Sequence, residues 1–382
     1  MSMSLRLRQL YHLISNPFEP PRADLRDPES IIIIGEDHRD ALDSIISLLA
    51  ESTDSRLIIL RGDWGTGKTA IIKKAIFSLE KMMKNELFVL YFRIPRRGLS
   101  FTELVLQMAI EAYKETLKRK ITLSNHIKNT IETWNKKLEE LEEFNVKKDK
   151  AISALFTILE EIAKQKKKIL IVIDQLENLQ VPRKDSEEFP TFLREIFDNI
   201  GKYGQVVIVL SGIIYRLDAM FSRDIWSRFI RAGTEIKDLG RLSEDDVILL
   251  FKTLLEKYRE PLYKDVYKEN RSLEPFTIDA IKEIWRLANG NPGKIYDISC
   301  TIVANAAKKG IERIDSTIVR YLAGEYDFKW IDAIERMPYI DICGLLSNIL
   351  EASRKLLDII SVSYTHLRAH ETEADLVCRL LL

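Results

Sequence analysis

The sequence predicts an α/β fold, a three-layer sandwich around a parallel five-stranded sheet, followed by an all-helical domain. Two observations carry this prediction. Up to about residue 242, short apolar runs alternate with helical patterns, which is typical of parallel strands covered by helices on both faces. From Ser243 onward the pattern is helical only. The chain has 382 residues, enough for two domains that need neither disulfides nor structural metal.

The N-terminal region contains the Pro-rich segment Asn16–Pro21. Proline fixes the backbone and removes hydrogen-bond donors, so residues 1–30 are expected to form an extended arm rather than a helix. A helix is predicted over Asp37–Ala50, where apolar side chains recur on one broad face. Five strands are expected after it, at Arg56–Leu60, Phe88–Arg93, Lys168–Asp174, Gln205–Ser211 and Glu235–Leu239.

A helical insertion at about residues 100–150 separates the second and third strands. Phe101–Leu117 is amphipathic, and Ile127–Lys150 carries mixed charges at helical spacing, typical of a solvated face or a helical hairpin. The patterns divide the chain into an arm (1–30), a core (31–242), a helical lid (243–309) and the start of a second helical region (310–361).

Residues 362–382 do not fit the pattern before them. Val362–Thr372 can be back-translated into a string that resembles a transposase-type sequencing adapter, and Asp375–Leu382 is similar to its continuation. We expect this stretch to be an artefact, with the natural C-terminal region missing. It is excluded from fold reasoning, and no metal site is assigned to His366, His370 and Cys378.

Composition limits the function classes. Lys+Arg and Asp+Glu are both 58, so net charge argues neither for nor against a nucleic-acid partner. No apolar run approaches the length of a membrane span. The three cysteines show no pairing or metal-ligand spacing, and the five histidines form no visible triad, zinc site or haem motif. We therefore expect a cytoplasmic protein with no membrane partner.

The segment Gly62-Asp-Trp-Gly-Thr-Gly-Lys-Thr69 matches the Walker A pattern of a glycine, four residues and Gly-Lys-Thr, between a strand and a helix. Glycines let the backbone turn its amides toward phosphates, and the helix directs its positive end at the same anion. Lys68 is expected to reach the outer phosphates, and the Thr69 hydroxyl to coordinate Mg²⁺. We expect Trp64 to pack in the loop rather than stack on a base. The predicted nucleotide-binding residues are Gly62, Asp63, Trp64, Gly65, Thr66, Gly67, Lys68 and Thr69.

The third predicted strand supplies the second half of the site. Its five apolar residues, Ile169–Ile173, indicate a buried strand, and Asp174 follows them directly. An acid at this position is typical of a Walker B motif. Asp174 is expected to hold Mg²⁺ opposite Thr69, directly or through water.

With both motifs placed, the chain resembles the AAA+ group of P-loop ATPases over roughly Asn16–Lys309. It looks closest to the branch of origin-recognition, STAND and transposition-helper ATPases, through Asn16-Pro-Phe18 and Gly35–Arg39 ahead of the loop. The resemblance implies a P-loop NTPase core that binds Mg²⁺ and clamps adenine between these elements and the lid, hence ATP over GTP. The Trp-Gly-containing phosphate loop also resembles that of KAP-type P-loop ATPases, a rival assignment that stays open.

Later positions match the group's sensors. Ser211 ends the fourth strand where the first sensor, a polar residue, contacts the outer phosphate. Arg228 matches the position of a trans-acting arginine finger, which implies a homo-oligomer joined through it; Arg231 is a nearby alternative. Lys294, after Gly290-Asn-Pro, matches the second-sensor region and is a candidate phosphate contact.

One departure concerns hydrolysis. The group usually places a glutamate directly after the magnesium aspartate to polarise the attacking water, and here that residue is Gln175. A glutamine can position water but cannot accept its proton as a carboxylate does. Glu177 is a nearby substitute whose direction the sequence leaves open.

The sequence therefore predicts an ATP-dependent molecular switch with slow hydrolysis. A non-hydrolysing nucleotide-binding scaffold is the first alternative, motivated by Gln175. A regulator with a DNA or protein partner is the second, with Lys118–Lys120 and Lys164–Lys168 as the only notable basic clusters for DNA.

Overall fold

The computed structural model describes residues 2–19, 27–139, 146–166, 168–180, 188–215, 217, 234–268 and 271–324. The chain splits into two compact units, Met1–Arg320 and Tyr321–Leu382, and the fold and the site lie in the first. Outside the described residues lie the expected adapter-derived tail, most of the second helical region, Arg228 and Arg231.

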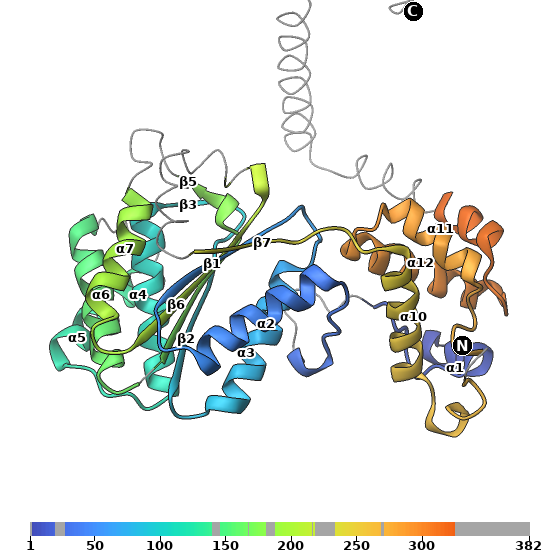
Figure 1. Cartoon of the computed structure of the whole chain (residues 1–382), viewed down its shortest axis with the longest axis horizontal. Helices are drawn as coiled ribbons and strands as arrows, with labels where there is room; N and C mark the ends of the chain where they lie inside the picture. The colour runs from blue at the N-terminus through green and yellow to red at the C-terminus, as the bar shows by residue number, and fades with distance from the viewer. Residues whose placement is uncertain are drawn as a thin grey trace, which may run out of the picture. The chain divides into compact units, whose positions relative to one another are not determined.

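A parallel five-stranded sheet forms the centre of the core (Figure 1). The predicted sheet is confirmed, and each strand lies within one residue of its expected ends. All its strands run the same way, so their carboxyl ends meet at one edge, where β6 lies between β4 and β1. The strands, in the order in which they pair, are β2 (Leu87–Arg93), β4 (Lys168–Asp174), β6 (Gln205–Gly212), β1 (Arg56–Arg61) and β7 (Glu235–Asp238).

Helices cover both faces of the sheet, which confirms the three-layer sandwich (Figure 1). Alternate residues of β1 enter opposite layers: Ile58 and Leu60 pack with α2 (Glu36–Glu51) and α3 (Lys68–Met83), while Leu57 and Ile59 belong to the other core. The second layer consists of α4 (Phe101–Lys118), α6 (Lys148–Ala163) and α7 (Glu188–Ile200), with α5 (Asn125–Glu139) against α4 and α6.

The helical insertion starts as predicted, with α4 over Phe101–Lys118. Ser100 begins this helix with a capping box in which Glu103 completes the reciprocal hydrogen bonds. The charged stretch 127–150 is divided between α5, which ends at Glu139, and α6, which begins at Lys148. Next to the main sheet, β3 (Leu99–Ser100) pairs with β5 (Leu179–Gln180) and ties the start of the insertion to the chain that follows β4.

The expectation of an extended arm over residues 1–30 is wrong for its first third. Residues Met3–Tyr11 form helix α1, which packs against α12. The prolines that argue against a helix begin only at Pro17, whereas Leu7 and Tyr11 are four residues apart and both are buried. Ser2 caps the helix by accepting a hydrogen bond from the Leu5 N–H. A short 3-10 turn, Pro28–Ser30, lies at the other end of this region.

A helical lid follows the sheet, as the fold class predicts. Its helices are α10 (Glu244–Tyr258), α11 (Ile278–Ala288) and α12 (Pro292–Lys309). Ser243 and Asp246 form a capping box at the start of α10. Asn289 and Gly310 end α11 and α12 in the left-handed conformation that closes helices. None of the described helices combines the length and apolarity needed to cross a membrane.

Arg259, at the end of α10, anchors the N-terminal helix to the lid. It is 2% exposed, and its guanidinium donates to the Tyr11 carbonyl at 2.5 Å and to the Glu274 carbonyl at 2.6 Å. It also lies 3.8 Å from the centroid of the Tyr267 ring. We expect Arg259→Met to lower the free energy of unfolding by about 3 kcal/mol, because two carbonyls lose a charged donor.

Urea denaturation measures this loss. Arg271→Met is the matched control, because Arg271 pairs with Glu274 at the surface and should barely change the unfolding midpoint. Equal midpoints for the wild type and Arg259→Met would exclude the anchoring role.

Candidate nucleotide-binding site

The loop between β1 and α3 has the backbone that phosphate binding requires. Gly65 and Gly67 have φ angles of 79° and 92°, which side-chain-bearing residues rarely adopt. A Cβ at Gly65 would also come within 2.6 Å of the Asn291 side chain. Helix α3 begins at Lys68, and its first turn has no acidic side chain to occupy its free N–H groups. The loop therefore directs backbone donors and a helix N-terminus toward one point.

Lys68 lies inside the curve of this loop. Its ammonium group donates to the carbonyl oxygens of Gly62 and Asp63, each at 2.8 Å. Burial lowers the pKa of Lys68, and the negative charges of Glu177, Asp174 and Asp63 act in the opposite direction. The loop backbone thus fixes the cation at the centre of the site.

Asp174 is the centre of a hydrogen-bond cluster at the carboxyl edge of the sheet. Its carboxylate is 1% exposed and accepts four hydrogen bonds. Thr69 Oγ1 and Tyr91 OH donate to Oδ2, at 2.8 and 2.9 Å. The Gln175 N–H, at 3.0 Å, and the Ser211 hydroxyl donate to Oδ1. The structure thus brings together Thr69, Asp174 and Ser211, which the sequence assigns to one site from three separate segments.

Glu177 lies in the turn that follows Asp174. Gln175 takes the left-handed conformation with a φ of 63°, and a 3-10 turn, Leu176–Asn178, follows it. Burial raises the pKa of Glu177, while Lys68 and nearby backbone N–H groups act to lower it. Its Oε2 atom is buried and has no hydrogen-bond partner among the described residues. The carboxylate therefore lies within electrostatic range of Lys68 and Asp174, with one oxygen unengaged.

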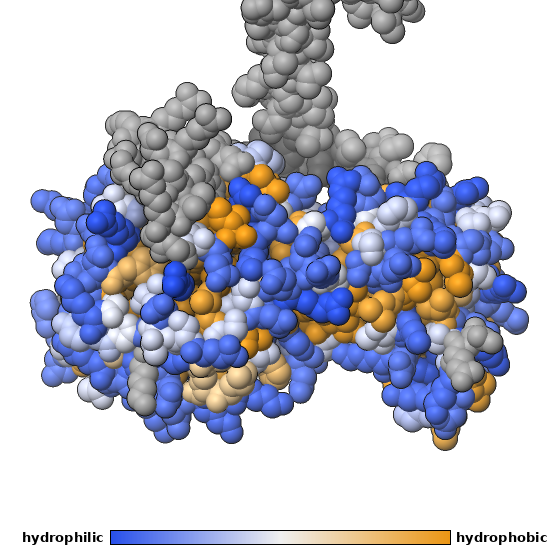
Figure 2. All heavy atoms as spheres, in the orientation of Figure 1, coloured by the Kyte–Doolittle hydropathy of each residue, from blue (hydrophilic) through white to orange (hydrophobic). Residues whose placement is uncertain are grey.

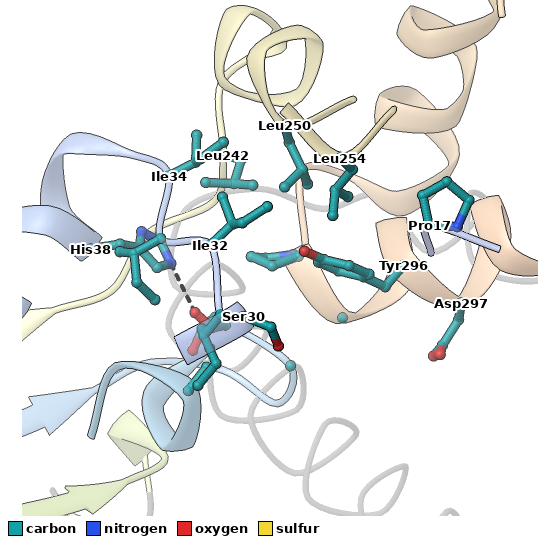
Figure 3. Close-up of a pocket in the computed structure, with 18 of the residues that line it drawn as sticks. Pro17, Ser30, Ile32, Ile34, His38, Leu242, Leu250, Leu254, Tyr296 and Asp297 are labelled. Carbon is teal, nitrogen blue, oxygen red and sulfur yellow. Dashed lines mark hydrogen bonds between the residues drawn. The ribbon is translucent and has the colours of Figure 1, made fainter. Parts of the chain in front are cut away.

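A cavity of about 330 Å³ adjoins the loop (Figure 3). It is largely apolar, and Gly65–Gly67 line it on the phosphate-loop side. His38 lies beside it and donates to the Thr66 carbonyl at 2.8 Å. Figure 2 shows hydrophobic residues gathered around α10 on the face drawn. Core, arm and lid all contribute side chains, including Ile32, Ile34, Pro17, Leu250, Leu254 and Tyr296.

The lid hydrogen-bonds directly to the phosphate loop. The Gly293 N–H, in the first turn of α12, donates to the Gly65 carbonyl at 2.9 Å. The Asn291 side-chain amide donates to the Trp64 carbonyl at 2.6 Å, and its oxygen caps α12 by accepting from the Lys294 N–H. The sequence matches Gly290-Asn-Pro to the second-sensor region, but it does not predict that Asn291 contacts the phosphate loop.

Two predicted nucleotide contacts, Trp64 and Lys294, do not line the cavity. The Trp64 side chain is 53% exposed and does not line the cavity, so it neither stacks there nor is fully packed in the loop. Lys294 is exposed and also absent from the cavity lining. Its phosphate contact stays a prediction, as does the role of Arg228, which lies outside the described residues.

A family model for an ATPase domain predominantly from Archaea matches residues 37–298. The chain belongs to this family. The matched range runs from α2, through the phosphate loop and Asp174, to α12 of the lid, whereas Pro17, Ile32 and Ile34 of the cavity lining precede it.

Two solved structures share the fold of this chain. ORC1 of Aeropyrum pernix, solved in complex with DNA, is 13% identical, with a TM-score of 0.56 over 87% of this chain and 75% of that one. Cdc6p of Pyrobaculum aerophilum is 14% identical, with a TM-score of 0.52 over 81% and 70%. At such identities the likeness shows the fold alone. No curated protein matches the sequence.

Proposed function

We propose that this ATPase domain binds Mg-ATP between core and lid and works as a nucleotide-dependent molecular switch with slow hydrolysis. The observation that carries the proposal is the hydrogen bond from the lid's Gly293 N–H to the Gly65 carbonyl, beside a cavity lined from both sides. A nucleotide held by the loop and the cavity would contact both elements at once. Its binding would therefore stabilise one arrangement of the lid over others.

The residues of the loop fit a triphosphate and its metal. The Thr69 hydroxyl and the Asp174 carboxylate lie 2.8 Å apart and offer only oxygen, the ligand that Mg²⁺ prefers. No group of three or more His, Cys, Asp or Glu side chains in the described part of the chain has metal-site geometry. This fits Mg²⁺, which takes one or two protein ligands and completes its shell with phosphate oxygens and water. When bound, the ion would neutralise phosphate charge.

The cavity fits a purine base. Its apolar side chains would remove the flat faces of the ring from water. Gly65–Gly67 of the phosphate loop line the same cavity, so the base and the phosphates would lie next to each other. We assign adenine rather than guanine from the resemblance to AAA+ ATPases, so competition between ATP and GTP is part of the test.

Titration calorimetry tests the proposal. We expect one ATP molecule to bind per chain, more tightly with Mg²⁺ than with EDTA. ATP should also displace GTP in competition. We also expect bound Mg-ATP to protect the segment between β7 and α10 from protease, because the lid closes on the loop. Absence of ATP binding in the presence of Mg²⁺ would refute the proposed function.

The two basic clusters are poorly suited to bind DNA. Lys118 pairs with Glu115, and Arg119 with Glu80. In the second cluster, Lys164 pairs with Glu160 at 2.8 Å. Lys166 and Lys168 donate to backbone carbonyls of neighbouring segments. These contacts engage most of the described basic side chains of the two clusters within the fold, so we leave DNA binding out of the proposed function.

A further inference from the structure

Tyr91 contacts the proposed metal site from β2, a strand on which the sequence predicts no site residue. It lies on β2, which pairs with β4, and its side chain belongs to the row of Leu87 and Val89, which pack under α3. At the end of this row the hydroxyl donates to Asp174 Oδ2 at 2.9 Å. Thr69 of α3 donates to the same oxygen at 2.8 Å. Three elements, β2, β4 and α3, therefore meet at one carboxylate oxygen.

The two donors to Oδ2 differ in kind. Thr69 is itself an expected metal ligand, so its hydrogen bond to Oδ2 can change when the metal binds. Tyr91 is not, and its phenol is fixed by the strand and by packing in the core beneath α3. A phenol keeps its proton at neutral pH, so the Tyr91 hydroxyl remains a donor to Asp174.

We propose that Tyr91 is a positioning residue for magnesium, whose hydroxyl holds the Asp174 carboxylate in the orientation that the metal requires. A carboxylate turns easily about its terminal torsion unless hydrogen bonds fix both oxygens. Ser211 and the Gln175 N–H fix Oδ1, and Tyr91 fixes Oδ2 independently of Thr69. Partners of this kind typically contribute 10–100-fold to metal affinity or activity. The inference rests on the proposed function, since it assumes that Mg²⁺ binds here.

Tyr91→Phe isolates the hydroxyl. Phenylalanine keeps the ring and its packing, including the Lys73 ammonium 5.9 Å from the ring centroid. The binding of ATP is measured first in EDTA and then as a function of Mg²⁺ concentration, with thermal unfolding as a check on the fold. We expect unchanged affinity in EDTA and an increase of about tenfold or more in the Mg²⁺ concentration that gives half of the metal-dependent gain.

Tyr113→Phe is the matched control. Its hydroxyl also donates to a carboxylate, that of Glu132 at 2.6 Å, but on α4 and α5 away from the loop. It should leave the Mg²⁺ dependence unchanged. A wild-type Mg²⁺ dependence in Tyr91→Phe would overturn the inference and leave the proposed function intact. An equal loss of ATP affinity with and without metal would do the same, because it indicates that the hydroxyl contributes to packing alone. A wild type that shows no Mg²⁺ dependence would instead refute the proposed function.

Discussion

Replacing Lys68 by alanine is expected to abolish measurable ATP binding. The Lys68 ammonium is held at the centre of the phosphate loop, and among the described residues it donates to the carbonyls of Gly62 and Asp63. Its partly buried position gives its charge more effect than a surface lysine has. Removing one partner of a desolvated charge pair costs about 2–5 kcal/mol, and each 1.4 kcal/mol is a tenfold change in affinity. We therefore expect a loss of affinity of about 30-fold to several thousand-fold.

The test compares two lysines of the same helix by calorimetry. Lys81, at the other end of α3, has a side chain that is 70% exposed and pairs loosely with Glu29 at 3.9 Å. Lys81→Ala should bind ATP as the wild type does. An affinity of Lys68→Ala within a few-fold of the wild type would contradict the assignment of the phosphate site, whatever the remaining activity.

The sheet and the phosphate loop could be predicted because their signals are local. A strand buried on both faces must be apolar along its whole length, and that run ends in Asp174. The glycines and Lys68 are fixed in spacing by the turn they make. The resemblance to AAA+ ATPases placed Ser211 in the same site. The structure brings it to Asp174 because parallel strands place their carboxyl ends at one edge of the sheet.

The contacts that complete the site depend on tertiary structure, so sequence patterns do not contain them. Asn291 looks like any helix cap until the lid lies on the loop. Tyr91 reads as one more aromatic residue of a strand. His38 sits in a helix pattern, and only the fold aims its ring at the Thr66 carbonyl. The sequence does not predict helix α1 for a different reason: its apolar period is short, and the prolines after Tyr11 indicate an extended chain.

Glu177→Gln is expected to lower the rate of ATP hydrolysis by about 100-fold, the typical contribution of a general base. The carboxylate lies within electrostatic range of Lys68 and Asp174, and its buried Oε2 has no hydrogen-bond partner among the described residues. Because the substitution removes a proton acceptor and no expected phosphate contact, kcat should fall while ATP affinity stays the same. The measurement is phosphate release with saturating Mg-ATP, paired with calorimetry. Glu235→Gln, on the edge strand β7, is the control and should change neither quantity.

The pH profile adds an independent readout. A general base must be deprotonated, so the rate should rise as pH increases through the pKa of Glu177. Burial raises that pKa, which moves this acidic limb upward from the usual glutamate value of 4.5. The limb should disappear from the residual rate of Glu177→Gln. An unchanged profile in that variant would exclude Glu177 as the base.

Gln175→Glu decides between the switch and the scaffold. If Glu177 is the working base, the wild type hydrolyses ATP slowly and Glu177→Gln is nearly inactive. Gln175→Glu then changes the rate only modestly, because residue 175 has its backbone in the left-handed conformation before Glu177. If the site instead evolved to retain ATP, the wild type and Glu177→Gln are equally silent, and only Gln175→Glu hydrolyses. The two hypotheses thus differ in which carboxylate accepts the proton. The hydrolysis rates of the wild type, Glu177→Gln and Gln175→Glu together exclude one of them.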